Sequence, residues 1–395
     1  MKKLSPASKW LIVAGARPNF MKIAPLIHAI RESNARNARI SPVIVHTGQH
    51  YDKVLSQIFF DDLGIPEPDF NLGIGSGSHA EQTGRIMIAF EQVALAQNPD
   101  LVVVAGDVNS TIACALVAAK LSIPVAHIEA GLRSFDKTMP EEINRILTDR
   151  ISDFLFTPSR DADENLRKEG IAAEKIFFVG NIMVDSLMLI MKHIHKSRIL
   201  SMLGKILDHH TGYAMITLHR PSNVDDKRTL EQVLGCIKEL SRDMPMLFPV
   251  HPRTAKQIND FGLGRNITWL DADYHIMRGQ NASNIYGLPP LGYLDFVTLM
   301  ARAKVIFTDS GGIQEESTVL GIPCITLREN TERPVTVTEG TNTITGNDPE
   351  KITGAFIRAI SPGEKSIRSI PALWDGKTAP RIVEILASKY FSAQS

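Results

Sequence analysis

The chain has 395 residues, of which 44% are hydrophobic and 22% charged, and its 43 basic and 43 acidic side chains give a formal net charge of zero. This length predicts two or three domains. The balanced charge argues against nucleic-acid binding, which needs a basic face for phosphate contacts, and the apolar content excludes a disordered chain. Without a long apolar run or a signal peptide, we expect a cytoplasmic protein that does not enter membranes.

The common cofactor and metal motifs are absent from the sequence. The three cysteines lie far apart and form no CxxC pair, which predicts reduced thiols rather than a disulfide framework or a metal site. No GxGxxG follows the first apolar run, and neither GxxxxGK[ST] nor HExxH occurs. We therefore expect neither a metal ion nor a bound cofactor.

Eleven short runs rich in Val and Ile alternate with helix-length amphipathic segments. Each run is bounded by Gly, Pro, Asp or Asn, as is typical of buried parallel strands. This alternation predicts an α/β protein with doubly wound parallel sheets. In chain order the expected strands are Trp10–Ala14, Ser41–His46, Leu101–Ala105, Val125–Ile128, Phe154–Thr157, Phe177–Val179, Tyr213–Leu218, Leu247–Val250, Ile267–Leu270, Val305–Thr308 and Cys324–Leu327.

Eleven strands exceed one compact sheet of the usual size, so we divide the chain into two doubly wound domains. The first covers residues 1–185 and the second residues 186–375, and a C-terminal helix at about 376–395 is expected to pack back on the first. Met188–His210 is interpreted as a long helix and connector. The polar, aperiodic stretch Asp271–Gly287 is predicted to be a long loop.

Charged side chains follow the predicted strands of the first domain, at the sheet edge where open α/β folds bind ligands. Arg17 opens a helix after the first strand, and a helix N-terminus beside an arginine suits a phosphate; an ordinary turn with a solvated arginine is the alternative. Asp107 follows the third strand. Asn109 and Ser110 are available to cap the next helix, which leaves Asp107 free for chemistry.

Two further glutamates complete a predicted carboxylate cluster. Glu129 follows the buried fourth strand, and a buried glutamate needs a partner, for which nearby Arg133 is the structural alternative. Glu141 and Arg145 lie four residues apart on one face of a predicted helix and are expected to point at one site. Asp107, Glu129 and Glu141 are therefore expected to lie together at one edge of the sheet. Clustered carboxylates shift one another's pKa, so that one can serve as an acid while another serves as a base.

The second domain carries the features of a nucleotide-diphosphate site. His219 and His251 end consecutive strands, each near an arginine. The segment Thr308–Glu316 puts small residues directly after a strand and opens a helix whose bare N–H groups suit a phosphate. Glu316 is placed to accept hydrogen bonds from a ribose diol. Leu291–Phe296 brings backbone groups and an aromatic ring within reach of a base.

Nine motifs run in order along most of the chain: GARPNFMKIAPL, HTGQHYD, GDVNST, HIEAGLRS, MPEEINR, HRPSNVDD, PVHPRT, TDSGGIQEE and LRENTERP. The chain thereby resembles the UDP-N-acetylglucosamine 2-epimerase family, in its non-hydrolysing branch. The resemblance implies a glycosyltransferase-B arrangement of two domains with the active site in the cleft between them. It also implies conversion of UDP-N-acetylglucosamine to UDP-N-acetylmannosamine through elimination of UDP to 2-acetamidoglucal and re-addition, in a homodimer that serves polysaccharide biosynthesis.

The resemblance further implies roles for particular residues. Asp107, Glu129 and Glu141 look like the carboxylates of proton transfer, and His219 looks like a catalytic residue beside the diphosphate. The remaining positions look like substrate contacts: Arg17, Ser310, Gly311 and Gly312 for the phosphates, Glu316 for the ribose, Leu291 and Phe296 for the uracil, and Lys22, Arg145, His251 and Arg333 along the cleft.

Departures from the family pattern leave alternatives open. Gln49 and His50 lie in HTGQHYD, where many members have TAQHR as part of a regulatory substrate site, so regulation by substrate is not implied here. Ser222 stands where some members have a glutamate. The alternatives are a 2-epimerase for a modified sugar such as a UDP-2,3-diacetamido uronic acid, a hydrolysing epimerase, a glycosyltransferase and a non-catalytic nucleotide-sugar sensor.

Overall fold

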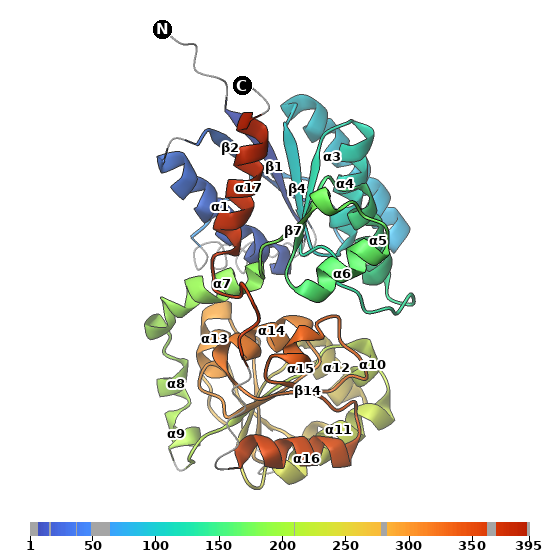
Figure 1. The fold of residues 1–395 in the computed structure, drawn as a ribbon. Helices are drawn as coiled ribbons and strands as arrows, with labels where there is room; N and C mark the ends of the chain where they lie inside the picture. Colours follow the sequence, from blue (N-terminus) through green and yellow to red (C-terminus); the bar gives the residue numbers. More distant parts are fainter. Residues whose placement is uncertain are drawn as a thin grey trace. The chain divides into compact units, whose positions relative to one another are not determined.

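The computed structural model describes residues 7–15, 17–36, 38–48, 64–208, 210–277, 283–361 and 369–392, without the side chains at 17, 18 and 390–392. The chain divides into two compact units (Figure 1). Unit 1 comprises residues 1–189 and 372–395, and unit 2 comprises residues 190–371. Each unit is built around a seven-stranded sheet in which all paired strands are parallel.

The unit 1 sheet has the strand order β3-β2-β1-β4-β5-β6-β7, so the chain changes direction across the sheet between β1 and β4. The central strands are buried apolar runs, as expected for a sheet covered on both faces. Its strands are β1 (Ser8–Ala14), β2 (Ile40–His46), β3 (Phe70–Asn71), β4 (Leu101–Ala105), β5 (Val125–Ile128), β6 (Phe154–Thr157) and β7 (Ile176–Phe178).

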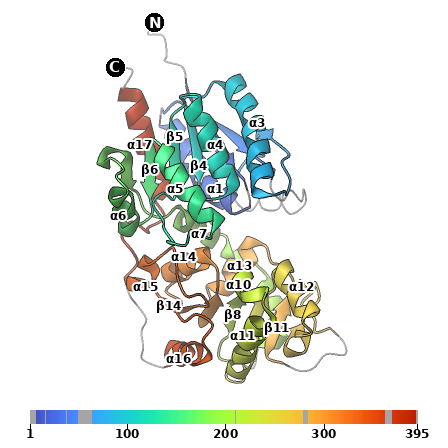
Figure 2. The ribbon, with the colours of Figure 1, turned by 90° about the vertical axis from the view of Figure 1, so that its right-hand side faces the viewer.

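The helices of unit 1 lie on both faces of this sheet (Figure 2). α3 and α4 pack together over a core that includes Leu11 and Val104, and α17 packs beside α1. Asp185 accepts hydrogen bonds from the first backbone N–H groups of α17, at 3.1 and 2.8 Å. The helices are α1 (Arg17–Ala35), α3 (His79–Gln97), α4 (Asn109–Lys120), α5 (Pro140–Ile151), α6 (Arg160–Lys168), η1 (Ala173–Lys175), α7 (Ile182–Met191) and α17 (Thr378–Ser392).

The unit 2 sheet has the order β10-β11-β9-β8-β12-β13-β14, and its change of direction falls between β8 and β12. Its strands are β8 (Ala214–Thr217), β9 (Met246–Pro249), β10 (Thr268–Trp269), β11 (Ile285–Leu288), β12 (Val305–Thr308), β13 (Cys324–Thr326) and β14 (Asn342–Ile344).

α11 and α16 of unit 2 pack together over an apolar core that includes Leu234, Phe248 and Phe356. The helices are η2 (Ile194–Lys196), α8 (Ile199–Met202), α9 (Gly204–Leu207), α10 (Pro221–Val224), α11 (Lys227–Leu240), α12 (Pro252–Asp260), η3 (Gly264–Asn266), α13 (Tyr293–Met300), α14 (Gly311–Leu320), α15 (Val335–Thr338) and α16 (Pro349–Ile360).

The predicted fold class, α/β with two doubly wound parallel sheets, is confirmed. Three strands were not predicted: β3 and β14 span only two and three residues, too few to show a pattern, and β11 starts inside the stretch that was predicted to be a loop. That prediction is therefore wrong from Ile285 onward. The expected long helix after Met188 is also wrong, because α7 ends at Met191 and short helical turns follow.

Candidate active site

At the carboxyl end of the unit 1 sheet, a lysine of α1 meets a glutamate at the end of β5. Lys22 Nζ forms an ion pair with Glu129 Oε2, and both side chains are largely buried. Gly106, directly after β4, lies beside this pair: a Cβ at this position would lie 2.6 Å from Lys22 Nζ. Its φ of +71° also favours glycine. The turn after β4 therefore needs a glycine for the ion pair to form.

Glu129 itself has an unusual backbone conformation. Its φ is +71°, which is rare for a residue with a side chain. Such strain persists where the surroundings enforce it, and it gathers at functional sites. The structural alternative, a pair with Arg133, is wrong: Arg133 pairs with Asp149 and Glu169, each at 2.7 Å, while Lys22 pairs with Glu129.

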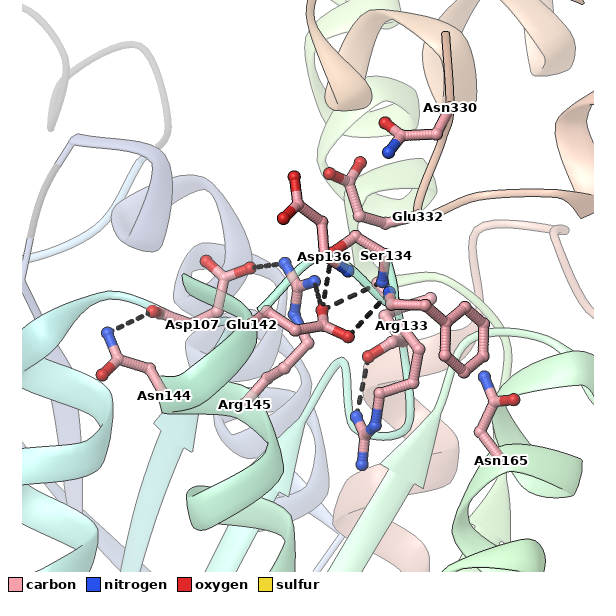
Figure 3. A network of polar contacts seen from close by, with 12 residues as sticks. Asp107, Arg133, Ser134, Asp136, Glu142, Asn144, Arg145, Asn165, Asn330 and Glu332 are labelled. Atoms are coloured by element: carbon pink, nitrogen blue, oxygen red, sulfur yellow. Dashed lines mark hydrogen bonds and ion pairs between the residues drawn. The ribbon is translucent and has the colours of Figure 1, made fainter. Parts of the chain in front are cut away.

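Asp107 provides a second carboxylate on the turn after β4 (Figure 3). It forms an ion pair with Arg145 of α5, whose other terminal nitrogen pairs with Glu142. Asn144, also on α5, donates a hydrogen bond to the backbone carbonyl of Asp107 at 2.9 Å. One turn of α5 thus holds both the backbone and the side chain of Asp107.

The expected capping of α4 is wrong in detail. The N-cap is Val108, which makes no side-chain capping bond. The Asn109 side chain instead donates to Gln82 at 2.8 Å, and the Ser110 hydroxyl shares a 2.7 Å hydrogen bond with Thr47. These contacts tie the start of α4 to its neighbours, while the Asp107 carboxylate pairs with Arg145.

Glu142 is a functional candidate that the sequence reasoning missed. It lies three residues before Arg145 and pairs with it, whereas Glu141, four residues before Arg145, was the glutamate expected to point at the same site. Residues three and four positions before Arg145 both lie on its face of the helix. The spacing that pointed to Glu141 therefore pointed equally to Glu142. Glu141 is half-buried in the first turn of α5, and its role as a third carboxylate stays a prediction.

At the carboxyl end of the unit 2 sheet, His219 follows β8 and Asp309 follows β12. His219 Nδ1 lies 2.9 Å from Asp309 Oδ1, and Asp309 is fully buried. Burial would raise the pKa of Asp309, but the hydrogen bond and charge of His219 and the backbone N–H groups of His219 and Arg220 lower it overall. The ionised Asp309 accepts the Nδ1–H of His219, so Nε2 is the ring nitrogen left for a ligand. Asp309, too, was missed as a site residue.

His251 lies close to this pair. It caps α12, where its Nδ1 accepts the backbone N–H of Arg253 at 3.2 Å. The ring centroids of His219 and His251 are 5.8 Å apart. The structure therefore brings together the two histidines that the sequence placed at consecutive strand ends.

The start of α14 is built from small residues. Ser310 is the N-cap, and Gly311 and Gly312 are the first helical residues. A Cβ on Gly311 would lie 2.5 Å from Arg333 Nη1, because the guanidinium, paired with Glu315 at 2.8 Å, packs against this residue. A Cβ on Gly312 would meet no described atom within 4 Å. Bare N–H groups beside a guanidinium suit a phosphate.

Glu316 lies farther along α14 and is buried. The Tyr293 hydroxyl donates to its Oε1 at 2.6 Å. Burial raises the pKa of Glu316 to about 7, with a further rise from Glu315 and an opposing effect of the Tyr293 hydrogen bond. Leu291 and Phe296 are half-buried on either side of Tyr293 in the chain. The predicted ribose and base contacts thus belong to one neighbourhood.

The side chains of three predicted positions lie outside the described structure. Arg17 opens α1, but its side chain is not among the described ones, and Gln49 and His50 are not described. Within the described ranges, no group of three or more His, Cys, Asp or Glu residues could hold a metal ion. No described helix is both long enough and apolar enough to cross a membrane.

Comparisons with known proteins identify the family. Residues 32–387 match the sequence model of the UDP-N-acetylglucosamine 2-epimerase family. A UDP-N-acetylglucosamine 2-epimerase of Methanocaldococcus jannaschii is 43% identical over 96% of this chain and 98% of its own length. A UDP-2,3-diacetamido-2,3-dideoxy-D-glucuronate 2-epimerase of Pseudomonas aeruginosa is 40% identical over 96% of this chain and 99% of its own.

A solved structure is similar as well. The crystal structure of the Methanocaldococcus jannaschii UDP-GlcNAc 2-epimerase in complex with UDP-GlcNAc and UDP matches with a TM-score of 0.83. The match has 43% sequence identity and covers 96% of this chain and 99% of the other.

Proposed function

The chain belongs to the UDP-N-acetylglucosamine 2-epimerase family, and from this membership we propose that it interconverts UDP-N-acetylglucosamine and UDP-N-acetylmannosamine. The observation that carries the proposal is the pair of carboxylates Asp107 and Glu129, each ion-paired with a cation at one sheet edge. Inversion at C2 requires a base on one face of that carbon and an acid on the other. Two carboxylates in separate ion pairs can serve as this base and this acid.

The proposed reaction is an elimination followed by re-addition. A carboxylate takes the C2 proton, the C2–H electron pair forms the C1=C2 double bond, and the C1–O bond breaks with its electrons leaving on UDP. The intermediate is 2-acetamidoglucal. UDP then adds back to C1 while an acid delivers a proton to the other face of C2. Asp107 and Glu129 are the proposed acid and base, and Glu141 is the third candidate.

We assign UDP binding to the α14 edge of unit 2. The first N–H groups of α14 and Arg333 suit the diphosphate, and Glu316 suits the ribose. In its doubly protonated form His219 donates Nδ1–H to Asp309 and suits the departing phosphate oxygen with its Nε2–H, because negative charge develops there as the C1–O bond breaks. The further substrate contacts that we propose are Arg17, Lys22, Arg145, His251, Leu291, Phe296 and Ser310.

Proton NMR of UDP-N-acetylglucosamine with the protein in D₂O tests the proposal. We expect a new UDP-N-acetylmannosamine anomeric signal and deuterium at C2, because the C2 proton exchanges with solvent during the reaction. Free N-acetylmannosamine with stoichiometric UDP would instead indicate a hydrolysing epimerase. An unchanged spectrum would contradict the proposed substrate.

A second candidate substrate is a UDP-2,3-diacetamido uronic acid. The Pseudomonas aeruginosa relative named for such a substrate is 40% identical, against 43% for the Methanocaldococcus jannaschii UDP-N-acetylglucosamine 2-epimerase. The same NMR experiment with the diacetamido sugar distinguishes the two, since only the true substrate should take up deuterium at C2. A cytoplasmic homodimer that supplies polysaccharide precursors completes the proposal and rests on the family resemblance alone.

A further inference from the structure

We propose that Glu142 is a positioning residue for the reaction and acts on Asp107 through Arg145. The inference rests on the proposed function, because it concerns the carboxylate chemistry of that reaction. Glu142 is 1% exposed, Arg145 is 4% exposed, and the Asp107 side chain is 28% exposed. The three charges form a chain from the interior of unit 1 to the open end of its sheet (Figure 3).

Glu142 can fix the position of Asp107 through Arg145, because the guanidinium between them is rigid and planar. Nη1 pairs with Glu142 and Nη2 pairs with Asp107. In such a fork, fixing one terminal nitrogen also fixes the other. A buried guanidinium also needs a buried negative partner, which Glu142 supplies. Without Glu142, Arg145 would lose the buried carboxylate that fixes its Nη1.

Glu142 is in turn held by three donors from one turn of the chain. The backbone N–H and hydroxyl of Ser134 and the backbone N–H of Phe135 each lie 2.9 Å from a Glu142 carboxylate oxygen. Phe135 has a φ of +60°, which is strained for an aromatic residue, and the residue is 78% exposed. Little burial is therefore available to offset the strain, and the backbone N–H bond to Glu142 is one contact that holds this conformation.

These contacts give α5 a grip on Asp107 from two directions. Arg145 holds the Asp107 carboxylate, and the adjacent Asn144 holds the Asp107 backbone carbonyl at 2.9 Å. Proton transfer depends on the position of the carboxylate within less than an ångström, and a displacement of that size costs on the order of 10²-fold in rate. Glu142 thus acts on turnover without touching the substrate.

The test is the Glu142→Gln variant, which keeps the side-chain size but removes the charge that pairs with Arg145. We expect kcat to fall on the order of 10²-fold, while KM and the calorimetric Kd for UDP stay within about twofold, since ground-state binding is not altered. A kcat equal to that of the wild type would overturn the inference.

A double-variant comparison separates action through Arg145 from a general loss of structure. Arg145→Lys keeps the charge but loses the fork, so it should lower kcat as Glu142→Gln does. If Glu142 acts through Arg145, the double variant should have the kcat of Arg145→Lys alone. Losses that multiply would show that the two residues act independently and would contradict the proposal.

A matched control and a milder variant complete the design. Asp163→Asn alters another buried carboxylate of unit 1, which accepts a hydrogen bond from Thr157, and should leave kcat unchanged.

Should Glu142→Gln fail to fold, Ser134→Ala removes only one donor to Glu142 and should still lower kcat. A wild-type kcat in Ser134→Ala would then overturn the inference. Deuterium uptake at C2 by the wild-type protein separates the test of the proposed function from the test of Glu142. If the wild type takes up no deuterium, the proposed function is wrong. If it does, the variant kinetics test the role of Glu142 alone.

Discussion

Asp309 has an unusually complete set of partners for one buried side chain. Besides His219 Nδ1, its carboxylate accepts the backbone N–H groups of His219 and Arg220 and the side-chain amide of Asn223, at 2.9 to 3.2 Å. Because an unpartnered buried carboxyl would be protonated, these donors keep it ionised. Asp309 thereby determines which ring nitrogen of His219 is available to a ligand.

The Asp309→Asn variant tests this role. An amide at position 309 removes the negative charge that stabilises the doubly protonated His219 ring, whose Nε2–H is the proposed donor to the phosphate oxygen. We expect kcat, measured by steady-state kinetics, to fall on the order of 10²-fold or more. This is the usual contribution of a positioned acid–base group. Asp225→Asn is the control: it removes an exposed ion pair with Arg253, which contributes little. Wild-type turnover in Asp309→Asn would contradict the role.

At the scale of single elements, α14 carries two features suited to nucleotide binding in its first six residues. Its N-terminus offers unpaired N–H groups, and Glu316, less than two turns later, offers a buried carboxyl whose pKa burial raises to about 7. The helix starts directly at the end of β12, so both features lie at the edge where the strand order changes direction. The helix is thus suited to bind a phosphate and a diol of one nucleotide.

Gly312→Ala probes this element without disturbing the free protein. The added methyl group meets no described atom, so stability should stay equal or rise by up to about 1 kcal/mol. If a phosphate approaches this backbone, the Kd for UDP should rise about tenfold or more, since a hydrogen bond to a charged group contributes about 1.5–3 kcal/mol.

Calorimetry with two further glycine variants controls this experiment. Gly235→Ala adds the same methyl group to α11, also in open space, and should leave the Kd for UDP unchanged. Gly311→Ala should lower both affinity and stability, because its Cβ would displace Arg333. Wild-type affinity in Gly312→Ala would place the diphosphate elsewhere.

At the scale of the whole molecule, two sheets of similar winding carry different groups at their carboxyl ends. Unit 1 presents the ion-paired carboxylates Asp107 and Glu129, and unit 2 presents His219, the α14 N-terminus and Glu316. Asp107 in unit 1, and His219 and α14 in unit 2, follow strands that flank the point where the strand order changes direction, which is where doubly wound sheets bind ligands. Glu129 follows β5, the strand next to β4. This division of groups leads us to expect that proton transfer and nucleotide binding can be impaired separately.

Glu129→Gln and Glu316→Gln should separate the two functions. We expect Glu129→Gln to lower kcat on the order of 10²-fold or more while the Kd for UDP changes less than about twofold. Glu316→Gln should raise that Kd about tenfold through loss of charge-assisted hydrogen bonds to the ribose. Calorimetry and steady-state kinetics on both variants measure the effects. Equal loss of UDP affinity in the two variants would contradict the division.

The sequence predicted most of the fold, because strands such as Leu101–Ala105 are buried apolar runs with clear ends. It missed β11, since that strand follows a polar stretch and contains Tyr286 and Gly287, which weaken the apolar pattern. Of the candidate site, the strand-end residues were predictable because parallel strands expose their carboxyl ends at one edge. The ion-pair partners of these residues were not predictable from the sequence. Glu141 and Glu142, for example, are both spaced to reach Arg145 on a helix, and only the packing of α5 distinguishes them.

The amino-acid sequence by itself determined the order of elements, the family and the charged residues at the strand ends, because hydrophobic periodicity, turn residues and motifs are local properties of a chain. Only the tertiary structure decided that Glu129 pairs with Lys22 rather than Arg133, and that Arg145 pairs with Glu142 rather than Glu141. These choices depend on how far each helix is rotated against its sheet. That rotation follows from packing between distant segments, so no local pattern encodes it.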